Sequence, residues 1–145
     1  MNRLVTIAII ISMLLAITLT AGCANKKSDE EALKTVIRNN LKALQEENLE
    51  NYLATLHPES PGYAQMEALC PKIFELYDLQ HKLIEIKVLS ISGDEARVRT
   101  VQEAIRLAGP ENYRNNRSTT VHTLKKYKGQ WRIFKTDQES MELLE

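Results

Sequence analysis

Apolar residues first recur every three or four positions, as on one face of a helix, and later alternate with polar residues, as in a strand. The first pattern predicts a helix over residues 28–46. A capping box formed by Ser28 and Glu31 is expected at its start. A short second helix is expected over residues 49–56 and a third over residues 63–77. Pro71 should kink or split the third helix because proline lacks an amide donor.

The alternating pattern that follows predicts four strands, over residues 83–92, 95–107, 118–127 and 130–135. A bulge is expected near Leu89, because Ile91 falls on the opposite parity to the apolar residues before it. The last ten residues are polar and are expected to form an extension. Helices followed by an antiparallel meander predict an α+β fold, with N-terminal helices packed on a curved antiparallel sheet.

Three stretches of this pattern resemble the nuclear transport factor 2-like superfamily, which includes polyketide-cyclase-like proteins. They are the break and short helix at 48–58, the passage from helix to sheet through 74–79 and 88–98, and the closing hairpin at 129–133. The resemblance spans residues 28–135. It implies a cone-shaped, cystatin-like domain with a pocket between helices and sheet, and frequent dimers formed through the sheet. It does not imply one activity, because this fold carries many.

An apolar segment with a single basic residue, Arg3, precedes the domain. The segment ends in Leu19-Thr20-Ala21-Gly22-Cys23, which resembles a bacterial lipoprotein processing site. The resemblance implies a protein held at the cell membrane by lipid (palmitate) and facing outside the cytoplasm; an uncleaved transmembrane helix is the alternative. The predicted division is a signal peptide over 1–22, lipidated Cys23 with a tether over 23–27, and one domain over 28–145.

Charge and cysteine content narrow the possible partners. Lysine and arginine together number 19, as do aspartate and glutamate, and this balance argues against nucleic acid as a partner. His57, His81 and His122 lack the spacing of metal ligands, so no metal or cofactor is expected. With Cys23 lipidated, Cys70 has no disulfide partner and is expected to be a buried, inert thiol.

Four polar residues are candidates to line an apolar pocket. A two-residue turn at Lys128-Gly129 would place Leu124 opposite Ile133, and both on one face with His122 and Trp131. Gln102 shares a face with the apolar residues before it, and Tyr52 and Tyr77 lie on the apolar sides of their helices. The predicted ligand-binding residues are therefore Tyr52, Tyr77, Gln102 and His122. The alternative for each of them is a hydrogen-bonded core residue or a residue of the hairpin surface.

No catalytic acid–base pair stands out. Asp78 is expected to face solvent, and Glu103 should lie with Arg97 and Arg99 in an exposed ion-pair stripe. The leading hypothesis is therefore a lipid-anchored domain that binds a small apolar ligand or a partner protein without catalysis. One alternative is an enzyme of the isomerase, cyclase or dehydratase type that acts on a hydrophobic molecule through His122 and a tyrosine. Another is a homodimerisation module that uses the outer face of the sheet.

Overall fold

The computed structural model describes residues 25–145. Contacts divide the chain into two units, Met1–Glu31 and Ala32–Glu145. The predicted signal peptide and Cys23 lie outside the described residues, so the boundaries proposed there stay predictions. From residue 25 to residue 145, no helix is long and apolar enough to cross a membrane.

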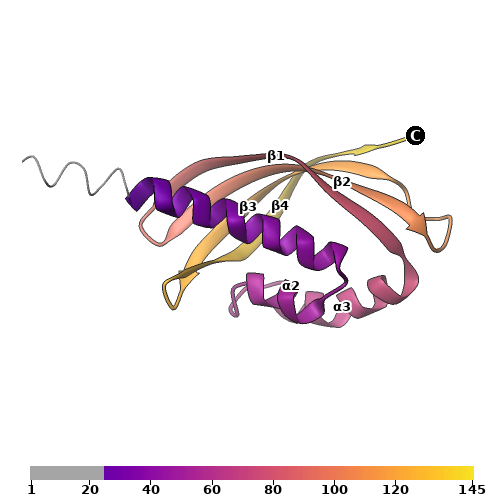
Figure 1. Cartoon of the computed structure of the whole chain (residues 1–145), viewed down its shortest axis with the longest axis horizontal. Coiled ribbons are helices and arrows are strands. Elements are labelled where there is room, and N and C mark those ends of the chain that lie inside the picture. The colour runs from indigo at the N-terminus through magenta and orange to yellow at the C-terminus, as the bar shows by residue number, and fades with distance from the viewer. Residues whose placement is uncertain (1–24) are drawn as a thin grey trace, which may run out of the picture. The chain divides into compact units, whose positions relative to one another are not determined.

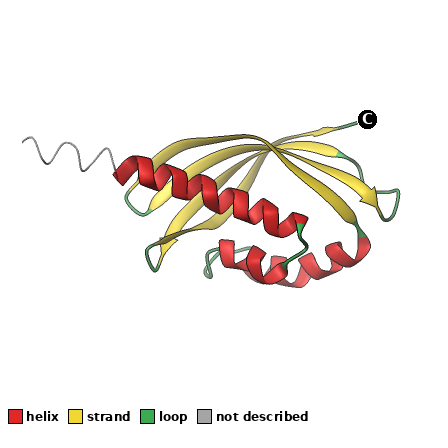
Figure 2. Cartoon of the chain, viewed as in Figure 1, coloured by secondary structure: helices red, strands yellow, loops and turns green. Residues whose placement is uncertain are grey.

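Helices occupy the first part of the described chain and strands the second (Figure 2). The N-terminal helix covers residues 25–45, so the capping box predicted at Ser28 is wrong. No proline or glycine interrupts residues 25–27, and they extend the helix into the predicted tether. Helix α2 follows over Leu49–Thr55, and Asn48 caps it by accepting a hydrogen bond from the Asn51 amide at 2.9 Å.

Helix α3 covers Tyr63–Leu76 and contains Pro71 without being split. The split considered from the sequence does not occur. Pro71 is exposed, while its neighbour Cys70 is buried. Because α3 buries only one side, the missing amide lies at the helix surface, where solvent can reach the unpaired carbonyl.

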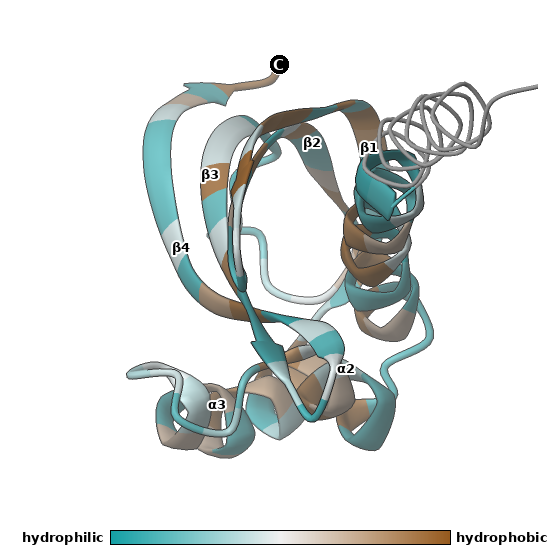
Figure 3. Cartoon of the chain, turned by 90° about the vertical axis from the view of Figure 1, so that its left-hand side faces the viewer, coloured by the Kyte–Doolittle hydropathy of each residue, from teal (hydrophilic) through white to brown (hydrophobic). Residues whose placement is uncertain are grey.

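The sheet has four antiparallel strands in sequence order, so that each strand pairs with its neighbours along the chain. The strands are β1 Asp78–Ser92, β2 Glu95–Ala108, β3 Asn116–Tyr127 and β4 Gln130–Leu143. Within the unit of residues 32–145, they form a curved wall with the helices on one side (Figures 1 and 3). The predicted α+β class, helices packed on a curved antiparallel sheet, is confirmed.

Two predicted strand boundaries are wrong. β1 begins at Asp78 instead of residue 83, and β4 continues through most of the predicted C-terminal extension. That extension pairs with the first half of β3, with Met141 opposite Ser118. Its side chains are mostly exposed, so main-chain pairing and not apolar alternation holds it in the sheet.

The predicted bulge and hairpin register are confirmed. The β1–β2 register shifts between Val88 and Ser90, and the last hairpin pairs Leu124 with Ile133. The hairpin places His122, Leu124, Trp131 and Ile133 on the face toward the helices, called the inner face below, where all four are buried. Leu33 and Ile37 of the N-terminal helix complete the same hydrophobic core.

Candidate functional site

An apolar pocket of about 310 Å³ lies between the helices and the start of the sheet. Its walls come from the end of the N-terminal helix, α2, α3, the start of β1 and the loop after β2. Most of the lining is aliphatic or aromatic, and a single acidic side chain, Glu47, borders it. The lining residues are Leu44, Glu47, Tyr52, Met66, Cys70, Ile73, Phe74, Tyr77, Leu79, His81 and Tyr113.

A tight turn between the first two helices builds one wall of this pocket. Glu47 adopts φ 52°, the left-handed conformation that ends a helix. Its amide donates to the Leu44 carbonyl at 3.2 Å, and the next amide, from Asn48, donates to the Ala43 carbonyl at 2.9 Å. Because Asn48 also caps α2, the turn holds Leu44, Glu47 and Tyr52 in one place.

Gln45 joins this wall to the edge of the sheet. Its Oε1 accepts a hydrogen bond from the His81 amide at 2.7 Å, and its Nε2 donates to the Leu79 carbonyl at 3.4 Å. β1 is an edge strand, and Gln45 therefore satisfies main-chain groups that no neighbouring strand pairs. This side-chain bridge positions Leu79 and His81 against the helices.

The buried ionisable groups of the pocket are uncharged at neutral pH. Burial raises the pKa of Tyr52 to about 12, with the nearby Cys70 adding to the effect. Burial also raises the pKa of the Cys70 thiol, and it lowers the pKa of the His81 imidazole. Cys70 is a free, buried cysteine, as the sequence predicted. The interior of the pocket thus presents neutral surface to a ligand.

Two of the four predicted ligand-binding residues, Tyr52 and Tyr77, line this pocket, and Gln102 and His122 do not. Gln102 is half-buried on the inner face, where its register neighbours are Leu83 and Ser118. The ligand-binding roles themselves stay predictions.

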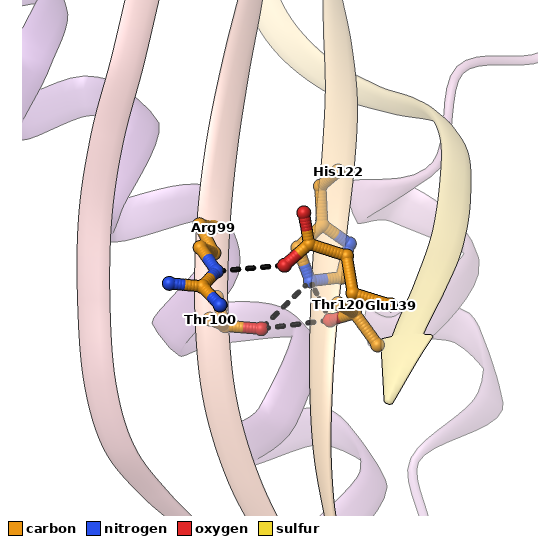
Figure 4. A network of polar contacts seen from close by, with 5 residues as sticks. All are labelled: Arg99, Thr100, Thr120, His122 and Glu139. Carbon is orange, nitrogen blue, oxygen red and sulfur yellow. Dashed lines mark hydrogen bonds and ion pairs between the residues drawn. The ribbon is translucent and has the colours of Figure 1, made fainter. Parts of the chain in front are cut away.

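His122 sits in a network of threonine hydroxyls on the inner face (Figure 4). Its Nε2 lies 3.1 Å from the Oγ1 atoms of both Thr100 and Thr120, and its Nδ1 lies 2.9 Å from Thr136 Oγ1. The two hydroxyls of Thr100 and Thr120 are 2.9 Å apart. Burial lowers the pKa of His122 to about 4, so the ring is neutral and both of its nitrogens are occupied by side chains.

The charged stripe predicted on the outer face exists with different partners. Arg99 pairs with Glu139 at 2.7 Å, the ion pair drawn beside the network in Figure 4. Glu103 pairs with Arg117 at 2.6 Å, and not with Arg97 or Arg99. The pairing differs because β3 and the extended β4 bring Arg117 and Glu139 across the sheet, which a β4 ending at residue 135 could not do.

Sequence reasoning missed three polar residues of the pocket, Glu47, His81 and Tyr113. His81 alternates with Leu79 and Leu83 toward the inner face, a signal hidden by placing the start of the strand at residue 83. Tyr113 reaches the pocket from a loop, and its ring centroid lies 5.3 Å from that of Tyr77. Across residues 25–145, no group of three or more metal-binding side chains is found.

Several solved structures share this arrangement. An NTF2-like protein with a cystatin-like fold from Novosphingobium aromaticivorans is 17% identical, with a TM-score of 0.70 over 83% of this chain and 87% of that chain. A protein provisionally assigned as a scytalone dehydratase from the same species is 16% identical, with a TM-score of 0.67 over 83% and 90%. A cystatin-like protein of unknown function from Nostoc punctiforme is 15% identical, with a TM-score of 0.62 over 76% and 89%.

The domain therefore has the NTF2-like, cystatin-like fold, as the sequence resemblance implied. The family described as the C-terminal domain of anti-sigma-I factor RsgI9 matches residues 35–144. The chain belongs to this family. A comparison with curated proteins gives no significant match.

Proposed function

We propose that this protein is a membrane-anchored binding domain whose pocket takes a small, mainly apolar ligand without changing it chemically. The observation that supports this is the pocket of about 310 Å³, which is within the size range of small-molecule sites and has mainly apolar walls. The family description names a domain of an anti-sigma factor, a regulatory protein, which favours binding over catalysis.

The chemistry of the pocket also favours binding. A general base is normally oriented by a hydrogen bond with a second group. Among residues 25–145, the His81 imidazole has no hydrogen bond or ion pair, and the Tyr52 hydroxyl and Cys70 thiol stay protonated at neutral pH. His122, the base of the enzyme hypothesis, is occupied by threonines outside this pocket.

The five tyrosines of the chain allow a direct test of ligand binding. Tyr52, Tyr77 and Tyr113 line the pocket, whereas Tyr63 and Tyr127 do not. The full chain is labelled with 3-fluorotyrosine, placed in nanodiscs of zwitterionic lipid and titrated with 3-phenylpropan-1-ol. Saturable ¹⁹F shifts of the first three resonances, with the other two unchanged, are the expected result.

A variant with a filled pocket serves as the control. Ile73 lines the pocket and is half-buried, so Ile73→Trp should remove the titration while leaving the Tyr127 resonance in place as a reporter of folding. If the probe causes no shift up to its solubility limit, or shifts all five resonances alike in the wild type and in Ile73→Trp, the binding function is wrong.

The membrane anchor is a separate part of the proposal. It is supported by the apolar segment over residues 4–21 and by Ala21-Gly22-Cys23 at its end. Two acyl chains at Cys23 would make anchoring stable. The chain has two cysteines, which supply a matched pair of variants. Labelling with a palmitate analogue in a bacterial host should be lost in Cys23→Ala and kept in Cys70→Ala; labelling that survives in Cys23→Ala contradicts the anchor.

A further inference from the structure

We propose that the ligand of this pocket is an organic cation with an apolar body, whose charged group is held at the pocket mouth by Glu47 and by aromatic rings. The inference rests on the proposed binding function of the pocket. It follows from a difference in charge. Acidic side chains lie along the edge of the pocket at Glu47, Phe74 and Tyr77, whereas the interior of the pocket is neutral.

A second, shallower hollow of about 690 Å³ lies beside the pocket and shares Glu47, Phe74 and Tyr77 with it. Four acidic side chains line this hollow, which is called the acidic basin below: Glu46, Glu47, Glu75 and Asp78. No lysine or arginine lines either the basin or the pocket. A ligand that fills the pocket therefore lies next to negative charge along the edge that the two hollows share, which is called the mouth below.

Little of this negative charge is neutralised by ion pairs, although the Arg106 guanidinium reaches the edge of the basin, where its Nη1 donates to the Gly109 carbonyl at 2.9 Å. Within residues 25–145, Lys42 forms one ion pair with the basin, at 3.8 Å from Glu46, and both side chains are largely exposed. Glu47, Glu75 and Asp78 have no ion pair with another described residue. Screening by water and salt weakens an exposed carboxylate, but three of them around one opening still favour a cation over an anion.

Aromatic rings stand where the pocket meets the acidic basin. Phe74 and Tyr77 line both hollows, and Tyr113 lies against Tyr77 with its ring tilted by 52°. The Tyr77 hydroxyl donates to Asn112 Oδ1 at 3.1 Å, which fixes the orientation of that ring. Ammonium groups bind to the faces of such rings, and the combination with a carboxylate is suited to substituted ammonium ions.

The part of the pocket that is not shared with the acidic basin suits the rest of such a ligand. Met66, Ile73 and Leu79 offer aliphatic surface there, and the neutral state of Tyr52 and His81 adds no charge. An anionic ligand would bring its charge to the carboxylates at the mouth, and a wholly apolar ligand would leave the mouth unused. An amphiphilic cation satisfies both regions.

Three probes with one common body test the inference on the 3-fluorotyrosine-labelled full chain: 3-phenylpropyltrimethylammonium, 3-phenylpropan-1-ol and 3-phenylpropanoate. In zwitterionic nanodiscs at physiological salt, the ammonium probe should bind about tenfold more tightly than the alcohol. The carboxylate probe should bind most weakly. Equal affinity for the ammonium and the alcohol would overturn the inference while leaving the binding function standing; failure of all three probes would remove the binding function itself.

Variants that remove one negative charge test whether the preference for the ammonium probe depends on the carboxylate of Glu47. Glu47→Gln should abolish most of the preference for the ammonium probe over the alcohol, because it removes one negative charge that both hollows share. Glu50→Gln is the matched control, because Glu50 carries the same charge nearby but lines neither the pocket nor the acidic basin. An equal loss of preference in both variants would overturn the assignment, since it would reflect net charge only. The unchanged Tyr127 resonance reports that each variant is folded.

Discussion

Replacing His122 should change how the stability of the protein depends on pH. The imidazole is 6% exposed and is surrounded by threonine hydroxyls, and burial lowers its pKa from the ordinary 6.5 to about 4. Between these two values the unfolded chain binds a proton that the folded chain does not. Acid therefore favours the unfolded state in this range, and stability is lost as the pH falls.

The size of the effect follows from the two pKa values. Each pKa unit corresponds to about 1.4 kcal/mol, so the difference between 6.5 and about 4 is worth about 3 kcal/mol in the limit of low pH. Most of this loss, about 2.5 kcal/mol, should have occurred on going from pH 7 to about pH 4.5. Above pH 7 the ring is neutral in both states and contributes no pH dependence.

The assay is urea unfolding of the wild type and of His122→Gln over that pH range. Glutamine keeps a donor and an acceptor for the threonines but does not titrate. All other groups, His81 included, are common to both proteins, so they cancel in the difference of unfolding free energies. The free energy of unfolding of the wild type minus that of His122→Gln should be about 2.5 kcal/mol smaller at pH 4.5 than at pH 7. A difference that stays constant within about 0.5 kcal/mol would refute the buried, neutral state of His122.

Two further predictions concern packing and backbone conformation. Leu33 is fully buried in the core, so Leu33→Ala should lower the free energy of unfolding by about 2–5 kcal/mol, whereas Leu143→Ala, at a side chain 59% exposed, should change it by less than about 0.5 kcal/mol. Gly109 has φ 105°, and a Cβ there would lie 2.4 Å from the Leu76 carbonyl oxygen, so Gly109→Ala should lower the free energy of unfolding by about 2 kcal/mol or more. Gly93 has φ 58° and open space around it, so Gly93→Ala should lower the free energy of unfolding by about 1 kcal/mol. Chemical denaturation measures both pairs, and equal losses within either pair would contradict the corresponding argument.

Local rules predicted much of the fold. The register of the last hairpin follows from a two-residue turn, with Gly129 at φ 77° and Lys128 at φ 50°. The bulge near Leu89 is visible in the parity of the apolar residues. The start of β1 was missed because only Leu79 is apolar among its first five residues, and its pairing depends on β2 and Gln45.

The pocket could be predicted only in part, for a related reason. Tyr52 and Tyr77 were found because helical periodicity places them on apolar faces. His81 and Tyr113 come from a strand end and a loop, and their approach to the helices depends on contacts between segments distant in the chain, such as that of Gln45 with the His81 amide. His122 was predicted correctly as a polar group on the inner face. Its three threonine partners were not predicted, because they come from three different strands of the sheet.

A homodimer formed through the outer face of the sheet stays a prediction made from the sequence. That face carries ion pairs such as Arg99–Glu139 around the buried Val121. Exposed ion pairs of this kind contribute little to stability, about 1 kcal/mol or less. Analytical ultracentrifugation at several protein concentrations tests this prediction by measuring the mass of the protein in solution. A monomer at every concentration would contradict it.

The most direct test of the binding function is a crystal structure of the protein with 3-(4-bromophenyl)propan-1-ol, read by the anomalous signal of bromine. The account predicts a bromine peak inside the pocket, against Met66, Ile73 and Leu79. A peak on the surface or beside the His122 network, or no peak in crystals saturated with the probe, would contradict it.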